Sequence, residues 1–82
     1  MADEDLRRRV HELDVTVWVG KAGIDPVVDE LDDQLSDREL VKAKFLRAAR
    51  GGTSTDELAE RLAESAGATL VETRGNTATF RR

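Results

Sequence analysis

The stretch from Val15 to Pro26, VTVWVGKAGIDP, constrains the fold more than any other part of the chain. Its first five residues are rich in β-branched side chains and place three valines at alternating positions, which is typical of a half-buried strand. The strand ends at Gly20. Asp25 followed by Pro26 is typical of a helix start, with the aspartate as the capping residue and the proline at the first helical position. The sequence therefore predicts a strand, a glycine loop and a helix in succession.

The loop Gly20-Lys21-Ala22-Gly23 has the composition of an anion-binding turn. Its glycines permit positive φ and let another molecule approach the main chain. Free amides, the positive end of the following helix and the mobile charge of Lys21 all favour an anion, such as a phosphate of a nucleic-acid backbone. Taken alone, such a pattern is more often an ordinary turn than a binding site.

The remaining sequence alternates between helical and strand patterns. Apolar residues at helical spacing predict helices over Ala2–Leu13 and Pro26–Leu35, and a third that starts within 53–57 and ends at Gly67. Two pairs approximate the capping-box spacing at the start of the third helix, Ser54 with Glu57 and Thr53 with Asp56. Alternating patterns predict strands over 15–19, 39–47, 68–72 and 77–81, with a hairpin-like turn at Arg74-Gly75-Asn76.

This order predicts an α/β (α+β) fold, with helices packed against a small four-stranded mixed sheet. Strands joined through helices are expected to be parallel neighbours, and the final tight turn adds an antiparallel pair. With 82 residues the chain has room for one domain, spanning residues 1–82. The strand around Val41, Ala43 and Phe45 directs one face to the core and presents Lys42 and Lys44 on the other.

Composition excludes several classes of protein. Without cysteine the chain has no disulfides, no thiolate chemistry and few of the usual structural zinc sites. It shows no apolar run long enough to span a membrane and no secretion signal, so we expect a cytoplasmic protein. We also expect a monomer. A Walker loop, a GxGxxG motif and a paired acid–base constellation are all missing, so we predict no catalytic residues, no metal and no cofactor.

Charge gives a mixed signal. The net charge of −4 by itself argues against a nucleic-acid partner. However, the acidic residues concentrate in the predicted helices, and arginine outnumbers lysine ten to three. An acid-rich, lysine-poor composition resembles that of proteins from salt-loving organisms, in which case the low isoelectric point reflects the solvent rather than the partner.

Several other side chains allow two interpretations. Arg7-Arg8-Arg9 is read as a solvated face with pairs such as Asp5 to Arg9, in preference to a phosphate contact. The acidic cluster at 29–33 lacks EF-hand spacing and is also read as a solvated face. His11 is assigned no role. Trp18 and Phe80 are candidates for stacking on bases; core packing is favoured for Phe80 and left open for Trp18.

Three separated motifs are characteristic of one family and cover almost the whole chain. The first joins Leu6 and His11-Glu12-Leu13 to the strand that runs into Gly20–Ile24, the second is Glu39–Phe45, and the third comprises Gly67-Ala68, Leu70-Val71, Gly75-Asn76-Thr77 and Phe80-Arg81. Together they resemble the YhbY-type, or CRM (chloroplast RNA splicing and ribosome maturation), RNA-binding domain.

The resemblance implies a fold similar to the C-terminal domain of translation initiation factor three, with an added N-terminal helix. It also implies RNA binding through the GxxG loop, here Gly20, Lys21, Ala22 and Gly23. Prokaryotic single-domain members, bacterial or archaeal, associate with precursors of the large ribosomal subunit, whereas plant members assist intron splicing in organelles. A chain with one such domain resembles the first group.

The expected function is therefore a non-enzymatic RNA-binding protein of ribosome biogenesis, with ribosomal RNA or a large-subunit precursor as partner. Lys42 and Lys44 would extend the positive track from the loop, and Arg47, Arg50 and Arg74 are weaker candidates for RNA contact. Two alternatives stay open. One is a protein-interaction module that uses the acidic helices, and the other is an RNA chaperone or splicing-type factor acting on non-ribosomal RNA.

Overall fold

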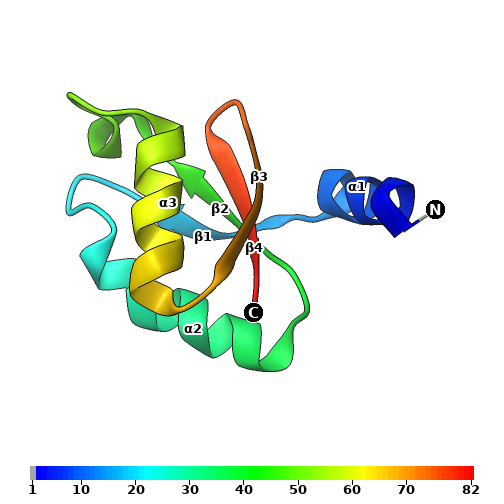
Figure 1. Cartoon of the computed structure of the whole chain (residues 1–82). Coiled ribbons are helices and arrows are strands. Elements are labelled where there is room, and N and C mark those ends of the chain that lie inside the picture. The colour runs from blue at the N-terminus through cyan, green and yellow to red at the C-terminus, as the bar shows by residue number, and fades with distance from the viewer. Residues whose placement is uncertain (1) are drawn as a thin grey trace.

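The chain alternates helices and strands in the order that its periodicity predicts (Figure 1). The computed structural model describes residues 2–82. Its helices are α1 (Ala2–Glu12), α2 (Val28–Asp37) and α3 (Thr55–Ala66), with short 3-10 turns η1 (Asp25–Val27) and η2 (Arg47–Ala49). Its strands are β1 (Val15–Val19), β2 (Val41–Phe45), β3 (Thr69–Arg74) and β4 (Thr77–Arg81).

The four strands form one mixed sheet in the order β1-β2-β4-β3. β1 and β2 are parallel, as expected for strands joined through a helix, and β3 and β4 form the expected antiparallel hairpin. The expectation that β2 and β3 would be neighbours is wrong, because β4 lies between them and pairs with both. Burial explains the order: Ala78, Thr79 and Phe80 of β4 are buried, whereas β3 is only partly buried and takes the edge.

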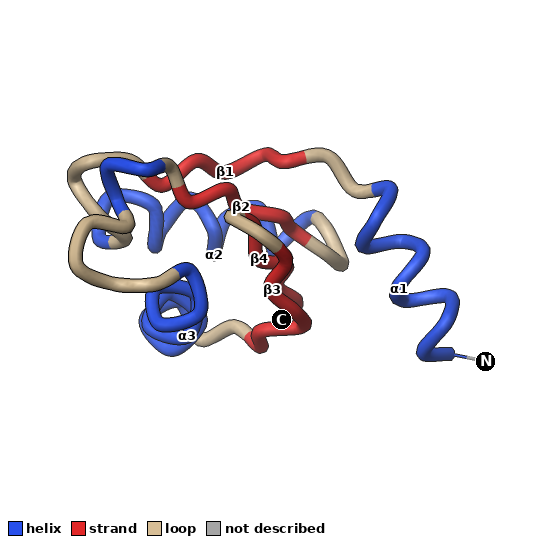
Figure 2. Tube along the Cα trace, turned by 90° about the horizontal axis from the view of Figure 1, so that it is seen from above, coloured by secondary structure: helices blue, strands red, loops and turns tan. Residues whose placement is uncertain are grey.

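One face of the sheet packs against α2 and α3 and carries the core (Figures 1 and 2). Because side chains alternate along a strand, the buried apolar residues of each strand fall on this face, whereas the buried Thr79 lies on the opposite face beside Lys42. The aromatic members of the core, Phe45 and Phe80, are fully buried, which confirms core packing for Phe80. The other large contributors are Val17, Val19, Leu31, Leu35, Val41, Leu58 and Leu62.

The boundaries of α3 follow local capping chemistry. The Oγ of Ser54 accepts a hydrogen bond from the backbone N–H of Glu57 at 3.2 Å, as the capping-box pattern predicts. The hydroxyl of Thr53 donates to Glu57 Oε2 at 2.7 Å, while Asp56 instead accepts a hydrogen bond from Thr73 of β3. Gly67 ends the helix in the left-handed conformation.

α1 lies on the opposite side of the sheet from α2 and α3 (Figures 1 and 2). It is anchored there by Val10, which is almost fully buried, and by an ion pair from Arg9 Nη2 to Glu39 Oε2 at 2.7 Å. The sequence predicts a pair between Arg9 and Asp5, one helical turn away. The structure corrects this prediction, because Arg9 pairs with Glu39 instead. The Arg9 guanidinium lowers the pKa of Glu39, first through its hydrogen bond and then through its charge.

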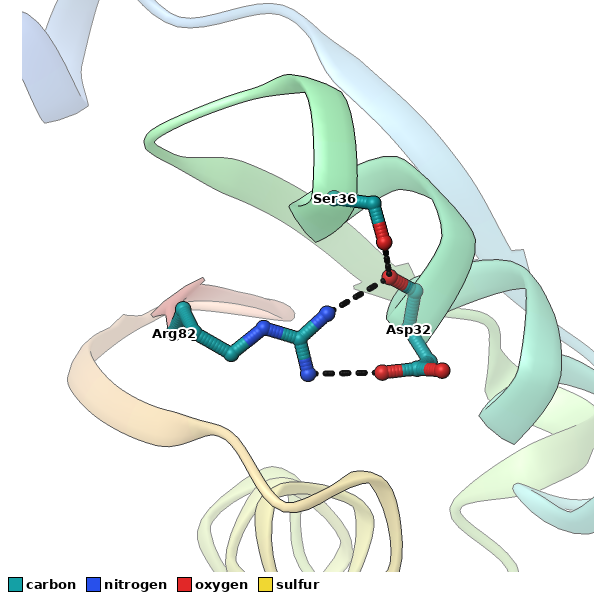
Figure 3. A network of polar contacts seen from close by, with 3 residues as sticks. All are labelled: Asp32, Ser36 and Arg82. Carbon is teal, nitrogen blue, oxygen red and sulfur yellow. Dashed lines mark hydrogen bonds and ion pairs between the residues drawn. The ribbon is translucent and has the colours of Figure 1, made fainter.

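The C-terminus is fastened to α2 (Figure 3). Arg82 donates from Nη1 to Asp32 Oδ1 at 2.6 Å and from Nη2 to the backbone oxygen of Asp32 at 2.9 Å. Ser36 Oγ donates to the same backbone oxygen at 3.2 Å. Among residues 2–82, no helix combines the length and the apolar character needed to cross a membrane.

Candidate nucleic-acid interface

The loop after β1 is a tight turn. The N–H of Gly23 donates to the carbonyl oxygen of Gly20 at 3.0 Å, which places Lys21 and Ala22 at an exposed tip. Gly23 has a φ of 83°, which glycine adopts at little cost and other residues rarely do. Gly20 does not need this freedom. A Cβ built at Gly23 would meet no atom within 4 Å, so the main chain of the loop is open to a ligand on that side.

The helix start after this loop differs from the prediction. Asp25 is not the capping residue; Ile24 precedes η1, and no side-chain hydrogen bond caps either η1 or α2. The N–H of Val27 donates to the carbonyl oxygen of Ile24 at 2.9 Å, so a 3-10 turn separates the loop from α2. The dipole of α2 therefore begins one turn further from the loop than the sequence predicts, and Lys21 becomes the main source of positive charge at the tip.

Two further loops reach the same end of the sheet. Parallel strands end at the same edge, and the N–H of Leu46 donates to the carbonyl oxygen of Val19 at 2.8 Å. Figures 1 and 2 accordingly show the loops after β1 and β2 on the same side of the molecule, away from α1. The N–H of Phe45 donates to the carbonyl oxygen of Asn76 at 2.7 Å, which adds the β3–β4 turn. We call this region, made of 20–23, 46–52 and 75–76, the loop edge.

The acidic and basic residues are unevenly distributed between the rest of the chain and three segments that include the loop edge and extend beyond it. The segments 15–24, 40–55 and 73–82 contain none of the 17 acidic residues of the chain. They carry eight of its 13 lysines and arginines, namely Lys21, Lys42, Lys44, Arg47, Arg50, Arg74, Arg81 and Arg82. These three segments are therefore cationic although the net charge of the chain is −4.

The structure brings some of the predicted contact residues together at the loop edge. Lys21 and Arg47 are exposed there, and Lys44 projects from the adjacent end of β2. Arg50 is partly buried, and its Nε donates to the carbonyl oxygen of Phe45 at 3.0 Å. This bond ties the side chain of Arg50 to the end of β2.

The other predicted residues lie on the face of the sheet opposite the core, which we call the open face. Lys42 is partly buried there, and Arg74 turns towards α1, where its guanidinium contacts the ring of His11. A hollow of about 230 Å³ separates α1 from the sheet at this point. It is lined by His11, Lys42, Glu72, Arg74, Thr77 and Thr79.

Trp18 and Leu46 are the two most exposed large apolar side chains of the described residues, at 55% and 39% exposure. Trp18 lies on the open face between the fully buried Val17 and Val19, so it is not a core residue. The alternation of the strand already contained this signal. No local pattern in the sequence indicates the contact of His11 with Arg74, since the two residues are 63 positions apart.

The acidic side chains of the described residues are dispersed. Across residues 2–82, no cluster of three or more histidine, aspartate or glutamate side chains is placed to hold an ion. The acidic residues of α2 are spread along the helix instead, and Asp32 is bound to Arg82.

Known proteins are similar to this chain in sequence and in fold. The protein named probable RNA-binding protein MJ0652, from Methanocaldococcus jannaschii, is 40% identical over 77 residues. The match covers 94% of this chain and 58% of that protein, so the chain spans somewhat more than half of the relative's length.

A solved structure matches over a similar extent. It is the solution structure of SAV1595 from Staphylococcus aureus, a candidate RNA-binding protein, and it superposes with a TM-score of 0.77 at 31% sequence identity. The match covers 96% of this chain and 81% of the other. The CRS1/YhbY (CRM) domain matches residues 2–82. The chain therefore belongs to the CRS1/YhbY (CRM) domain family.

Proposed function

We propose that this chain is a non-enzymatic RNA-binding protein that acts in ribosome assembly and holds the RNA backbone at the Gly20–Gly23 loop. The observation that carries the proposal is the charge division: the loop edge, with the exposed Lys21 and Arg47, lies within segments that contain no acidic residue, in a protein whose net charge is negative. Phosphate contacts need clustered cations rather than a basic protein as a whole. The names of the relatives at 40% and 31% identity also support RNA as the ligand.

The loop suits phosphate for two reasons. Its main chain is open at Gly23, where no atom would meet an added Cβ, so an anion can approach the backbone. Lys21 at the tip and Arg47 on the neighbouring loop are both exposed and can reach an anion there. Contacts of this kind position an RNA strand without reading its sequence.

The test compares two charge reversals of equal size. Lys21→Glu alters the loop, whereas Arg61→Glu alters an exposed position in the middle of α3, on the other layer of the molecule. Both change the net charge by the same amount. We expect Lys21→Glu to weaken binding to ribosomal RNA fragments in a filter-binding assay, and Arg61→Glu to leave it nearly unchanged. Equal effects would show that only the net charge matters and would contradict a loop site.

The role in assembly needs a separate experiment. Tagged protein from lysate, with and without RNase, is sedimented at the salt concentration of its own cytoplasm. We expect co-migration with precursors of the large subunit that RNase or Lys21→Glu abolishes. RNase-resistant association with a polypeptide would instead favour a protein-interaction module, and RNase-sensitive migration away from ribosomal particles would favour a factor acting on other RNA.

A further inference from the structure

Trp18 presents an unusual surface for a small acidic protein. It is the only tryptophan of the chain, and more than half of its side chain is exposed. Its exposure follows from the strand geometry: Val17 and Val19 on either side are fully buried, and adjacent side chains of a strand point to opposite faces. An exposed aromatic ring of this size offers a large apolar area that a ligand can cover.

The neighbours of Trp18 define what can cover it. It pairs in register with Lys44 of β2, which is followed across the sheet by Thr77 of β4 and Arg74 of β3. This row of the open face therefore contains one aromatic, two cationic and one hydroxyl-bearing side chain and no carboxylate. Leu46, the other exposed apolar residue, follows shortly after Lys44 at the loop edge.

The row is close to the loop that is proposed to hold phosphate. Trp18 precedes Gly20 by two residues, a distance of about 7 Å along an extended strand. A single nucleotide can bridge this distance, with its phosphate at the loop and its base at the ring. The cations Lys44 and Lys21 then lie on the path of the sugar–phosphate backbone.

We propose that Trp18 is a stacking platform for an unpaired base of the RNA strand that the Gly20–Gly23 loop holds. This inference rests on the proposed function and narrows its ligand to single-stranded RNA. Aromatic side chains bind bases through their faces, and those faces are accessible only where the strand is not paired and stacked. The row that contains Trp18 carries no acidic residue, which suits a polyanion.

A second copy of the chain fits the surface less well. A stable dimer buries about 800 Å² per partner around an apolar centre. Here the exposed apolar area comes from two side chains, Trp18 and Leu46, and lysines and arginines surround it. In a symmetric dimer these cations would face the same cations of the second copy and repel them.

The experiment uses the fluorescence of Trp18, since the chain has no other tryptophan and no tyrosine. The probes are a short unstructured RNA oligonucleotide of mixed sequence and a duplex of comparable length. We expect the single strand to quench the emission of the full chain and the duplex to change it little. Unchanged emission while the single strand binds would overturn the proposal.

Substitutions separate stacking from charge. Trp18→Ala should weaken binding of the single strand about 5- to 150-fold, which corresponds to a stacking contribution of about 1–3 kcal/mol per base. Duplex affinity and the salt dependence should remain unchanged, and Trp18→Phe should retain most of the affinity. Lys21→Ala, in contrast, should lower the slope of log K against log salt by about 0.7 for a single strand.

The outcomes distinguish the two proposals. If Lys21→Ala weakens RNA binding while Trp18→Ala does not, the stacking platform is wrong and the loop site stands. If neither oligonucleotide binds the full chain, the proposed function fails together with the inference. A change of emission with protein concentration alone, accompanied by a doubled mass in light scattering, would assign the surface to a second copy. Should Trp18→Ala fail to fold, the quenching experiment and Trp18→Phe decide the question.

Discussion

The loop after β1 contains two glycines that the structure places in different conformations, and replacing each by alanine tests that difference. Gly23 has a φ of 83°, and an added Cβ would meet no atom within 4 Å. The cost of Gly23→Ala is therefore conformational rather than steric. A residue with a Cβ in the left-handed region costs about 1–2 kcal/mol.

Gly20→Ala is the matched control. Gly20 has no positive φ, and its added Cβ would lie 3.9 Å from Leu46 Cδ1, an ordinary van der Waals contact. We expect the unfolding free energy of the Gly20→Ala variant to be unchanged or slightly raised. Alanine reduces the conformational freedom of the unfolded chain, and the native backbone at this position is one that alanine can adopt.

Thermal unfolding followed by circular dichroism measures both changes. For a domain of this size, 1 kcal/mol corresponds to about 4–8 °C in Tm, so Gly23→Ala should lower Tm by about 4–16 °C. Urea denaturation at low temperature checks that the m-value is unchanged. Equal losses for the two variants, or a neutral Gly23→Ala, would refute the assigned loop conformation.

The same pair bears on RNA binding when measured well below the transition. The methyl group at Gly23 enters the space from which an anion would approach, whereas the one at Gly20 faces Leu46. Gly23→Ala should therefore weaken RNA binding more than Gly20→Ala.

Other predictions concern the scaffold. Ser54→Ala should cost about 1 kcal/mol of unfolding free energy in urea denaturation, because it removes the hydrogen bond to the N–H of Glu57; no loss would contradict the cap. Phe80→Ala should cost about 3–5 kcal/mol and leave much of the chain unfolded, while Phe80→Leu should fold; similar behaviour of the two would argue against a tightly packed site. The Arg9 pair lowers the pKa of Glu39, so its contribution is present above the pKa of the unfolded carboxyl group and is lost as the pH falls through the folded pKa. Thermal unfolding between neutral and acidic pH should show a smaller acid-induced loss for Arg9→Ala than for the unaltered chain, and an identical loss would indicate that the pair adds nothing.

Local patterns in the sequence were sufficient for most elements. β1 and β4 have the predicted bounds, since β1 ends at the glycine loop and β4 begins directly after the turn at 75–76. The predicted strand 39–47 is shortened to Val41–Phe45. The predicted ends leave the sheet: Leu40 is buried before the strand begins, and η2 begins at Arg47. The alternation in the sequence continues through both positions and so does not reveal these boundaries.

Long-range features could not be read from local patterns. The insertion of β4 between β2 and β3 depends on which strand of the hairpin is better buried, and this is decided by the packing of Ala78 and Phe80 against the helices. The candidate site shows the same division. The glycine loop and the exposure of Trp18 follow from local spacing, whereas the contact of Arg74 with His11 and the ion pair of Arg9 with Glu39 depend on how α1 docks.

The position of β4 makes the order of synthesis matter. Its residues are translated after all the other strands, yet they supply the hydrogen-bonding partners of both β2 and β3. Until residue 81 has left the ribosomal exit tunnel, those two strands keep open edges, which are sites for pairing with other chains. The sheet can therefore be completed only at the end of translation of this segment. Shortened chains that stop before Thr77 should accumulate as aggregates rather than as a smaller folded protein.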